Sequence, residues 1–385
     1  MTARRWARFP CTSKPRSCEA TRARRGPMNA ETLELPIRDT RIAELSVKQV
    51  LPTPAWFLAA RGDELPRGAP LARAVNGVPV VLYRDSTGRV AALEDRCPHK
   101  NVALSLGRVR GDTLQCWYHG WRFNRIGVVV DVPCHSPTEK IPACAVRAFP
   151  AVERDEWIWV TLGADGAPAE PPSYPRDDAY GWFELQNVIH APVDLILENG
   201  LDCSHTGFAH EGLFRSAPRD DIRARIEETA TGVRVETLDE HSAGAKDVRS
   251  VLGRRQQIRH VDEVILPHTL RVDYWIGDHA HVVTILVATP EDEFRTRVYT
   301  RMGVRYGWLT PLVTRYVRWV TQKVVAQDIA ILNSQGERIR RYGRREFRNV
   351  TADLPAAWMQ RAFRGFLDGR YPSGPLRTRE ITYKL

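Results

Sequence analysis

The sequence lacks any long, uninterrupted hydrophobic run. Its longest apolar stretch near the C-terminus is broken by Arg315, Arg318 and Lys323, and residues 1–27 contain no apolar segment of signal-peptide length. A transmembrane helix needs about 20 consecutive apolar residues, so we expect no membrane span. Disulfide patterning is missing too, because the 7 cysteines suggest no disulfide framework. This favours a reducing compartment, the cytoplasm.

Acidic residues are almost missing from residues 1–27, which hold eight Lys or Arg and one Glu. That segment supplies +7 of the formal net charge of +10, so the rest of the chain is nearly balanced. A nucleic-acid-binding surface is therefore not expected. We interpret residues 1–45 as a leader, disordered at least to residue 27, with Met28 as the start of the protein. An organellar transit peptide is the alternative.

The 385 residues suffice for two domains of ordinary size. Short β-branched runs predict an all-β first domain over residues 46–163. Residues 164–182 are rich in proline and show no apolar periodicity, so we interpret them as a linker. Residues 183–385 mix strand-like and helical segments, which predicts an α+β domain with a central antiparallel sheet. In it we expect a helix over 191–208, strands over 232–238, 281–289 and 296–304, and a helical end.

Two short hairpins carry mixed cysteine and histidine pairs. Cys97-Pro98-His99 is followed, after sixteen residues, by Cys116-Trp117-Tyr118-His119. Two thiolates and two imidazoles are the ligands of a Rieske [2Fe–2S] cluster, with sulfur on one iron and histidine on the other. Structural zinc is the alternative, although zinc sites pair cysteine with cysteine or histidine with histidine at this spacing. We expect Trp117, Tyr118 and Trp121 to shield the cluster from water.

Both hairpins resemble the cluster-binding loops of Rieske non-haem iron oxygenases, and the resemblance extends over about residues 45 to 335. It implies a second, mononuclear iron held by two histidines and one aspartate. Residues 198–210 resemble the segment with the pattern Asp-x-x-His-x4-His, at Asp202, His205 and His210. Residues 327–335 resemble the segment that supplies the carboxylate, at Asp328.

Such a ligand set leaves coordination positions open for O₂ chemistry. His205 and His210 are five residues apart, about 140° on an ideal helix, so a bulge or break near Gly207 must bring them together. Asp328 lies on an otherwise apolar helical stripe, where a metal ion would compensate its charge. A salt bridge to a nearby arginine is the alternative.

Asp202 precedes His205 by three residues and can fix the orientation of its imidazole. The resemblance implies that Asp202 also bridges to the cluster ligand His119 of a neighbouring subunit, and hence a homotrimer or a multiple of it. It places Asn199 near the site, although a helix-capping role is equally compatible. We expect Cys203 to be a packing residue.

The resemblance implies a terminal oxygenase that uses O₂, Fe(II) and a [2Fe–2S] cluster. Electrons would come from NAD(P)H through a ferredoxin or flavin reductase. The likeness is greatest to the vanillate-demethylase and chlorophyll-catabolic branch, which implies hydroxylation or oxidative demethylation of an aromatic or polycyclic substrate. The alternative is a Rieske electron carrier without a catalytic second iron. We expect residues 220–304 to line the substrate pocket, with aromatic walls at Tyr274, Trp275, His268 and Phe294, although a position in the hydrophobic core explains each of these four residues equally well.

Overall fold

The computed structural model describes residues 50–52, 55–136, 138–163, 170–211, 213, 221–241, 257–278, 280–372 and 374–384. The proposed leader, residues 1–45, lies outside the described residues, and so does part of the proposed linker, residues 164–169. The predicted domain boundaries therefore stay predictions.

The first domain is all β, as predicted, and consists of three small antiparallel sheets. Its strands are short because turns interrupt them every few residues. The sheets are β1-β11-β10, β2-β3-β4-β9 and β5-β6-β7-β8, in the order of hydrogen-bonded neighbours. The strands are β1 (Trp56–Arg61), β2 (Leu71–Val75), β3 (Val78–Arg84), β4 (Val90–Glu94), β5 (Arg108–Arg110), β6 (Thr113–Gln115), β7 (Arg122–Phe123), β8 (Val129–Asp131), β9 (Ala148–Phe149), β10 (Ala151–Arg154) and β11 (Trp157–Thr161).

The second domain is built on an eight-stranded antiparallel sheet, which confirms the predicted α+β class. Its strands are rich in the β-branched residues that pack well in sheets. In spatial order they are β12 (Gly181–Ile189), β18 (Arg295–Arg305), β17 (Ala280–Asp292), β16 (Thr269–Ile276), β15 (Ile258–Ile265), β14 (Gly232–Thr237), β13 (Asp221–Glu228) and β19 (Thr378–Lys384).

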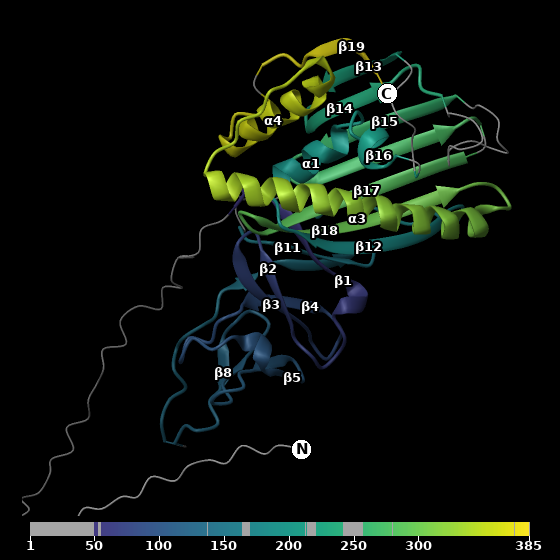
Figure 1. Ribbon diagram of the computed structural model, residues 1–385. Helices are drawn as coiled ribbons and strands as arrows, with labels where there is room; N and C mark the ends of the chain where they lie inside the picture. Colours follow the sequence, from purple (N-terminus) through teal and green to yellow (C-terminus); the bar gives the residue numbers. More distant parts are fainter. Residues whose placement is uncertain are drawn as a thin grey trace, which may run out of the picture. The chain divides into compact units, whose positions relative to one another are not determined.

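Helices α1 (Val193–Leu201), α3 (Thr310–Tyr342) and α4 (Leu354–Leu367) lie over one face of this sheet (Figure 1). The single helix expected over 191–208 is wrong, because it divides into α1 and the short α2 (Thr206–Ala209). The expected helical end is also wrong, since β19 follows α4, pairs with β13 and forms the edge of the sheet. Only Ile381 of β19 is buried, which left too weak a pattern to read from the sequence.

Strand β17 shows how the sheet separates two environments, because successive side chains point to opposite faces. Val282, Thr284 and Leu286 line a cavity on the helical side. The intervening residues of β17, Val283, Ile285 and Val287, face the other way. They belong to a buried cluster with residues from β1 and β11 of the first domain, namely Trp56, Leu58, Trp157 and Trp159. The two domains are thus in direct contact.

Hydrogen bonds reinforce this contact. The Tyr299 hydroxyl donates to the carbonyl of Ala59 at 2.6 Å, and the Thr289 hydroxyl donates to the carbonyl of Leu58 at 2.7 Å. Both accepting carbonyls belong to β1, so the strand is tied to the sheet through its backbone as well as through its apolar side chains.

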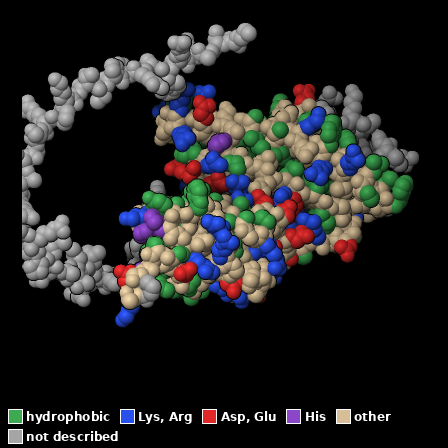
Figure 2. Space-filling model, turned by 90° about the horizontal axis from the view of Figure 1, so that it is seen from below, with side chains coloured by type: hydrophobic (Ala, Val, Ile, Leu, Met, Phe, Trp, Pro, Cys, Tyr) green, Lys and Arg blue, Asp and Glu red, His purple; other side chains and the backbone are tan. Residues whose placement is uncertain are grey.

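Positive and negative side chains are interspersed over the face shown in Figure 2, and no broad area of that face carries only Lys and Arg. This agrees with the near balance of charge beyond residue 27. Among the helices of the described residues, none combines the length and the apolar character that crossing a bilayer requires.

Candidate functional site

The four proposed cluster ligands lie on two neighbouring loops of the first domain, one after β4 and one between β6 and β7. Cys97 and Cys116 are buried, whereas His99 and His119 are partly exposed, with their ring centroids 4.5 Å apart. The two sulfur atoms therefore face the core and the two imidazoles face outwards. This division fits a Rieske cluster, in which thiolates hold one iron and histidines hold the other.

Backbone hydrogen bonds fix each loop. The Cys97 amide donates to the Val102 carbonyl at 2.8 Å, and the Cys116 amide donates to the Trp121 carbonyl at 2.8 Å. Gly120 follows His119 with a φ of 74°, a left-handed conformation in which any other residue would be strained. The turn at Gly120 thus lets the chain reverse directly after the second proposed histidine ligand.

In these two loops burial favours the neutral forms of the proposed ligands Cys97 and His99. Burial raises the pKa of the Cys97 thiol to about 11, and the adjacent Cys116 adds to this effect. Burial and the neighbouring His119 lower the pKa of His99, which keeps its imidazole neutral and able to donate a lone pair. A bound cation would lower the pKa of the cysteine thiols, because it stabilises the thiolates that are the ligands of such a cluster.

The predicted aromatic shield is only partly present. Trp121 is 9% exposed and stacks on His99, with ring centroids 4.7 Å apart and planes within 6°. Trp117 and Tyr118 are 66% and 62% exposed, so the prediction that they exclude water is wrong for the single chain. They occupy the tip of the loop, where no other described segment covers them, and Tyr118 contacts His119 at 3.9 Å between ring centroids.

In the second domain, His205, His210 and Asp328 converge on one point, and we call them the ligand triad. Their potential ligand atoms all lie within 4.8 Å of one another. Oδ1 of Asp328 lies 3.4 Å from Nε2 of His205 and 3.2 Å from Nε2 of His210. Two imidazoles and one carboxylate in this arrangement form the facial set that non-haem Fe(II) oxygenases use.

The two histidines approach each other because the helix breaks before His205, not at Gly207 as expected. Asp202 leaves the helical conformation at the end of α1, and its Oδ1 accepts a hydrogen bond from the Ser204 amide at 2.9 Å. Such local side-chain bonds compete with the helical pattern. The turn α2 then carries His205 at its start and His210 at its end.

Helix α3 brings Asp328 to this turn. Asn333 accepts a hydrogen bond from the His190 amide at 2.7 Å, one turn beyond Asp328. Gly336 permits close contact there, because a Cβ atom at this position would collide with the carbonyl of His190. These contacts hold the segment before α1 against α3. They thereby position the two histidines of the ligand triad, which follow α1, relative to Asp328 on α3.

The ligand triad is prepared for a positive charge. Burial alone would lower the pKa of His205, but Asp202 and Asp328 outweigh it and raise the pKa to about 9. His205 and His210 in turn hold the pKa of Asp328 below its usual range despite burial. Because a cation at this point stabilises the carboxylates, the residues fit a bound Fe(II).

The other proposed residues surround the triad. Oδ2 of Asp202 lies 3.5 Å from Nδ1 of His205, on the side away from Asp328. Asn199 lies within α1, so it is not a capping residue, and its amide is 3.5 Å from Oδ1 of Asp328. Gln327 had no assigned role, yet its Oε1 lies 2.9 Å from Nδ1 of His210. A hydrogen bond from Nδ1 would leave Nε2 of His210 free to bind a metal.

The ligand triad opens onto a cavity of about 530 Å³ between the sheet and the helices, here called the inner cavity. Tyr274 lines it, as predicted. Trp275 is the next residue on β16, so it faces the opposite side and stacks on His281. Nε2 of His268 donates a hydrogen bond to the Trp56 carbonyl of the first domain at 2.9 Å, and Phe294 lies at the β17–β18 turn. Neither of these two lines the inner cavity, so three of the four predicted wall residues are wrong.

A second hollow, the outer groove, lies on the other side of the same residues. Asn199, Asp202 and His205 line both the inner cavity and the outer groove. Helix α3 contributes its far end to the groove, including Arg338 and Tyr342. Asp202 therefore stands in the wall between the triad and the surface.

Comparisons with known proteins identify both domains. The family model described as Rieske [2Fe-2S] domain matches residues 55–150, and the one described as Vanillate O-demethylase oxygenase C-terminal domain matches residues 189–368. The first match decides between the two kinds of metal site that the cysteine and histidine spacing left open, in favour of [2Fe–2S].

Individual relatives cover only parts of the chain. The toluene-4-sulfonate monooxygenase iron-sulfur subunit TsaM1 of Comamonas testosteroni is 36% identical over 46% of this chain and 52% of its own length. Chlorophyllide a oxygenase, chloroplastic, of Chlamydomonas reinhardtii is 27% identical over 75% of this chain and 44% of its own length. The chain thus spans about half the length of these relatives.

The fold has a clear counterpart among solved structures. The crystal structure of dicamba monooxygenase bound to dicamba superposes with a TM-score of 0.70, covering 82% of this chain and 97% of that one. The sequence identity is 23%, so this likeness supports the fold alone.

Proposed function

Because this chain belongs to the Rieske non-haem iron oxygenases by both of its domains, we propose that it is the terminal oxygenase subunit of such a system. The observation that carries the proposal is the convergence of His205, His210 and Asp328 on one point beside the inner cavity. The alternative, an electron carrier, gives no reason for such a triad in the second domain.

In this proposal Cys97, His99, Cys116 and His119 hold the [2Fe–2S] cluster, and the ligand triad holds Fe(II). The bound metals supply the one-electron and O₂ chemistry that side chains cannot provide. The surrounding residues do the rest. The aliphatic walls of the inner cavity orient the substrate and exclude water, while Gln327 and Asp202 hold the two imidazoles.

Asp202 is the proposed electron bridge. Its position between the inner cavity and the outer groove supports this role, since a histidine from another subunit can reach Asp202 only from outside. Exposed Trp117 and Tyr118 flank His119 and offer the apolar surface that a docked protein would cover. We therefore propose a homotrimer, or a multiple of it, in which His119 of one subunit contacts Asp202 of the next.

The electrons would come from NAD(P)H through a ferredoxin or flavin reductase. The proposed reaction is hydroxylation or oxidative demethylation of an aromatic or polycyclic substrate, consistent with the named reactions of the matched family and relatives. We propose the cytoplasm as its location. The chloroplast relative keeps an organelle as the alternative.

Metal analysis of the purified protein tests the proposal. An oxygenase should contain about three iron atoms per chain, two in the cluster and one at the triad, and should consume O₂ when reductase and substrate are added. A carrier should contain about two. Two iron atoms after anaerobic loading with excess Fe(II), together with no O₂ uptake, would overturn the proposed function.

A further inference from the structure

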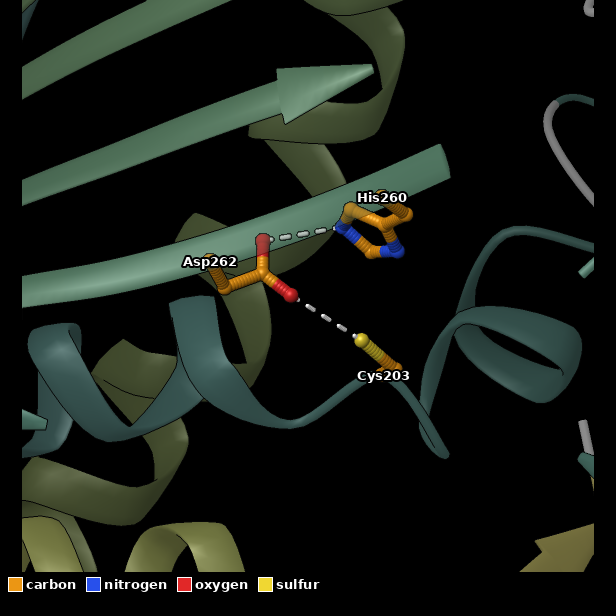
Figure 3. Close-up of side chains that lie close together, drawn as sticks. All are labelled: Cys203, His260 and Asp262. Carbon is orange, nitrogen blue, oxygen red and sulfur yellow. Dashed lines mark hydrogen bonds and ion pairs between the residues drawn. The ribbon is translucent and has the colours of Figure 1, made fainter. Parts of the chain in front are cut away.

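A second cluster of chemically active side chains lies at the inner cavity, separate from the ligand triad. It consists of Cys203, His260 and Asp262, all buried (Figure 3). Nε2 of His260 lies 2.9 Å from Oδ1 of Asp262, and the Cys203 thiol donates to Oδ2 at 3.4 Å. His260, on the same strand β15, orients one oxygen of Asp262, and Cys203, in the segment after α1, orients the other.

A further carboxylate lies behind this cluster. Nδ1 of His260 is 3.2 Å from Oε2 of Glu240, whose side chain is also buried. Burial alone would lower the pKa of His260, but Asp262 and Glu240 outweigh it and raise the pKa. Each oxygen of Asp262 accepts one hydrogen bond and has a second lone pair for a further donor. A cation or hydrogen-bond donor in the inner cavity would therefore be stabilised beside this carboxylate, and an anion would be repelled by it.

The remaining wall of the inner cavity is mainly apolar. Among the described residues that line it, none is Lys or Arg, and most are aliphatic. Polar side chains such as Thr284 and Thr300 are neutral. The carboxylates of Asp202 and Asp328 are engaged with His205. Asp262 is therefore the lining carboxylate that is not committed to the ligand triad.

We propose that Asp262, oriented by His260 and Cys203, is the polar end of the substrate cavity and selects neutral or cationic substrates with an N–H or O–H donor. Carboxylate and sulfonate substrates are disfavoured. Glu240 acts through His260 as a positioning residue. This inference rests on the proposed function, because it assigns a substrate class to the same cavity.

Three aromatic probes of nearly equal size test the inference on the purified holoenzyme without reductant, so that no turnover occurs. They are 4-methoxybenzylamine, a cation, 4-methoxybenzamide, a neutral donor, and 4-methoxybenzoate, an anion. Calorimetric titration should give a dissociation constant at least about tenfold lower for the amine and the amide than for the benzoate. Equal or tighter binding of the benzoate would overturn the inference without any variant.

Asp262→Asn removes the charge and keeps the size of the side chain. It should weaken amine binding about tenfold and reduce the discrimination against the benzoate. Asp273→Asn is the matched control, because Asp273 pairs with His281 at 3.0 Å on the neighbouring strand but does not line the inner cavity. The same loss in both variants would assign the effect to folding and overturn the role of Asp262.

Metal analysis separates this inference from the proposed function. A protein that lacks the triad iron but still prefers the amine would overturn the proposed function alone, whereas full iron with a preference for the benzoate would overturn the inference alone. An additional metal ion per chain that disappears in Asp262→Asn would show that Cys203, His260 and Asp262 form a metal site. That result would also overturn the inference.

Discussion

Nε2 of His210 lies 3.2 Å from Oδ1 of Asp328, although one residue ends a four-residue turn and the other lies in the middle of a 33-residue helix. The contact exists because the segment before α1 is fastened to α3 beyond Asp328. A metal at this point would therefore connect two elements that the backbone already holds in place.

Asp328→Ala should remove the mononuclear iron and leave the cluster intact, because the two sites lie in different domains. Iron content should fall from about three to about two per chain, while the visible spectrum of the cluster persists. Glu337→Ala, an exposed position on the same helix, serves as the control. Normal turnover in Asp328→Ala would return the residue to a salt-bridge role.

Cys97→Ser should abolish the [2Fe–2S] cluster, since thiolate is the soft ligand that the cluster requires. Absorption spectroscopy of the purified variant measures the loss. Cys134→Ser should keep the spectrum, because this cysteine is exposed and is not one of the four proposed ligands. A full-intensity cluster spectrum in Cys97→Ser would show that the ligand assignment is wrong.

Asp202→Asn should leave both metal centres assembled and block electron transfer between them. The substitution keeps the size of the side chain but removes the charge that steadies His205. Stopped-flow reoxidation of the reduced cluster, with substrate and O₂, should slow sharply at unchanged iron content. Reoxidation at the wild-type rate would exclude the bridge, and loss of the triad iron would make Asp202 a metal-holding residue.

Gln327→Met should weaken iron binding at the triad by about 10- to 100-fold, because the partner of Nδ1 of His210 is lost while the volume is kept. Competition with a chelator, followed by iron analysis, measures the change. Gln322→Met, at an exposed position of α3, should behave like the wild type. Equal iron retention in the two variants would contradict the role of Gln327.

His268 predicts a pH dependence of stability. Burial lowers its pKa to about 4 in the folded protein, so the unfolded chain binds the proton more tightly. The contribution of neutral His268 to the free energy of unfolding is fully present above about pH 6.5, the pKa of histidine in the unfolded chain. This contribution is lost as the pH falls towards 4. Between pH 7 and pH 5 the free energy of unfolding should fall by about 2 kcal/mol from this residue.

His268→Gln cannot take up this proton. Urea unfolding at pH 7 and pH 5 should therefore show a smaller loss of stability for the variant than for the wild type, by about the same 2 kcal/mol. An equal pH dependence in both proteins would mean that His268 is not buried as a neutral imidazole.

The sequence predicted most of what depends on local pattern. The short β-branched runs were sufficient to predict an all-β first domain, and the spacing of Cys97, His99, Cys116 and His119 was sufficient to propose the cluster loops. The apolar stripe of α3 singled out Asp328, because a carboxylate at a half-buried position needs a partner.

What depends on distant contacts could not be predicted. The helix break lies at Asp202 because of a bond to the Ser204 amide, whereas composition pointed to Gly207. Trp275 and Tyr274 differ by one residue, and only the register of β16 decides which of them faces the inner cavity. The pairing of His260 with both Asp262 and Glu240 requires the sheet to be assembled.

In the proposed oxygenase, the side chains that would hold the metal and those that would contact the substrate come from different parts of the fold. The triad comes from α2 and α3, whereas Asp262, Tyr274, Thr284 and Thr300 come from separate strands of the sheet. Libraries restricted to inward-facing strand positions can therefore alter which compounds are accepted while the oxidising centre stays untouched. Laboratory evolution of the proposed oxygenase towards new substrates would begin with those positions.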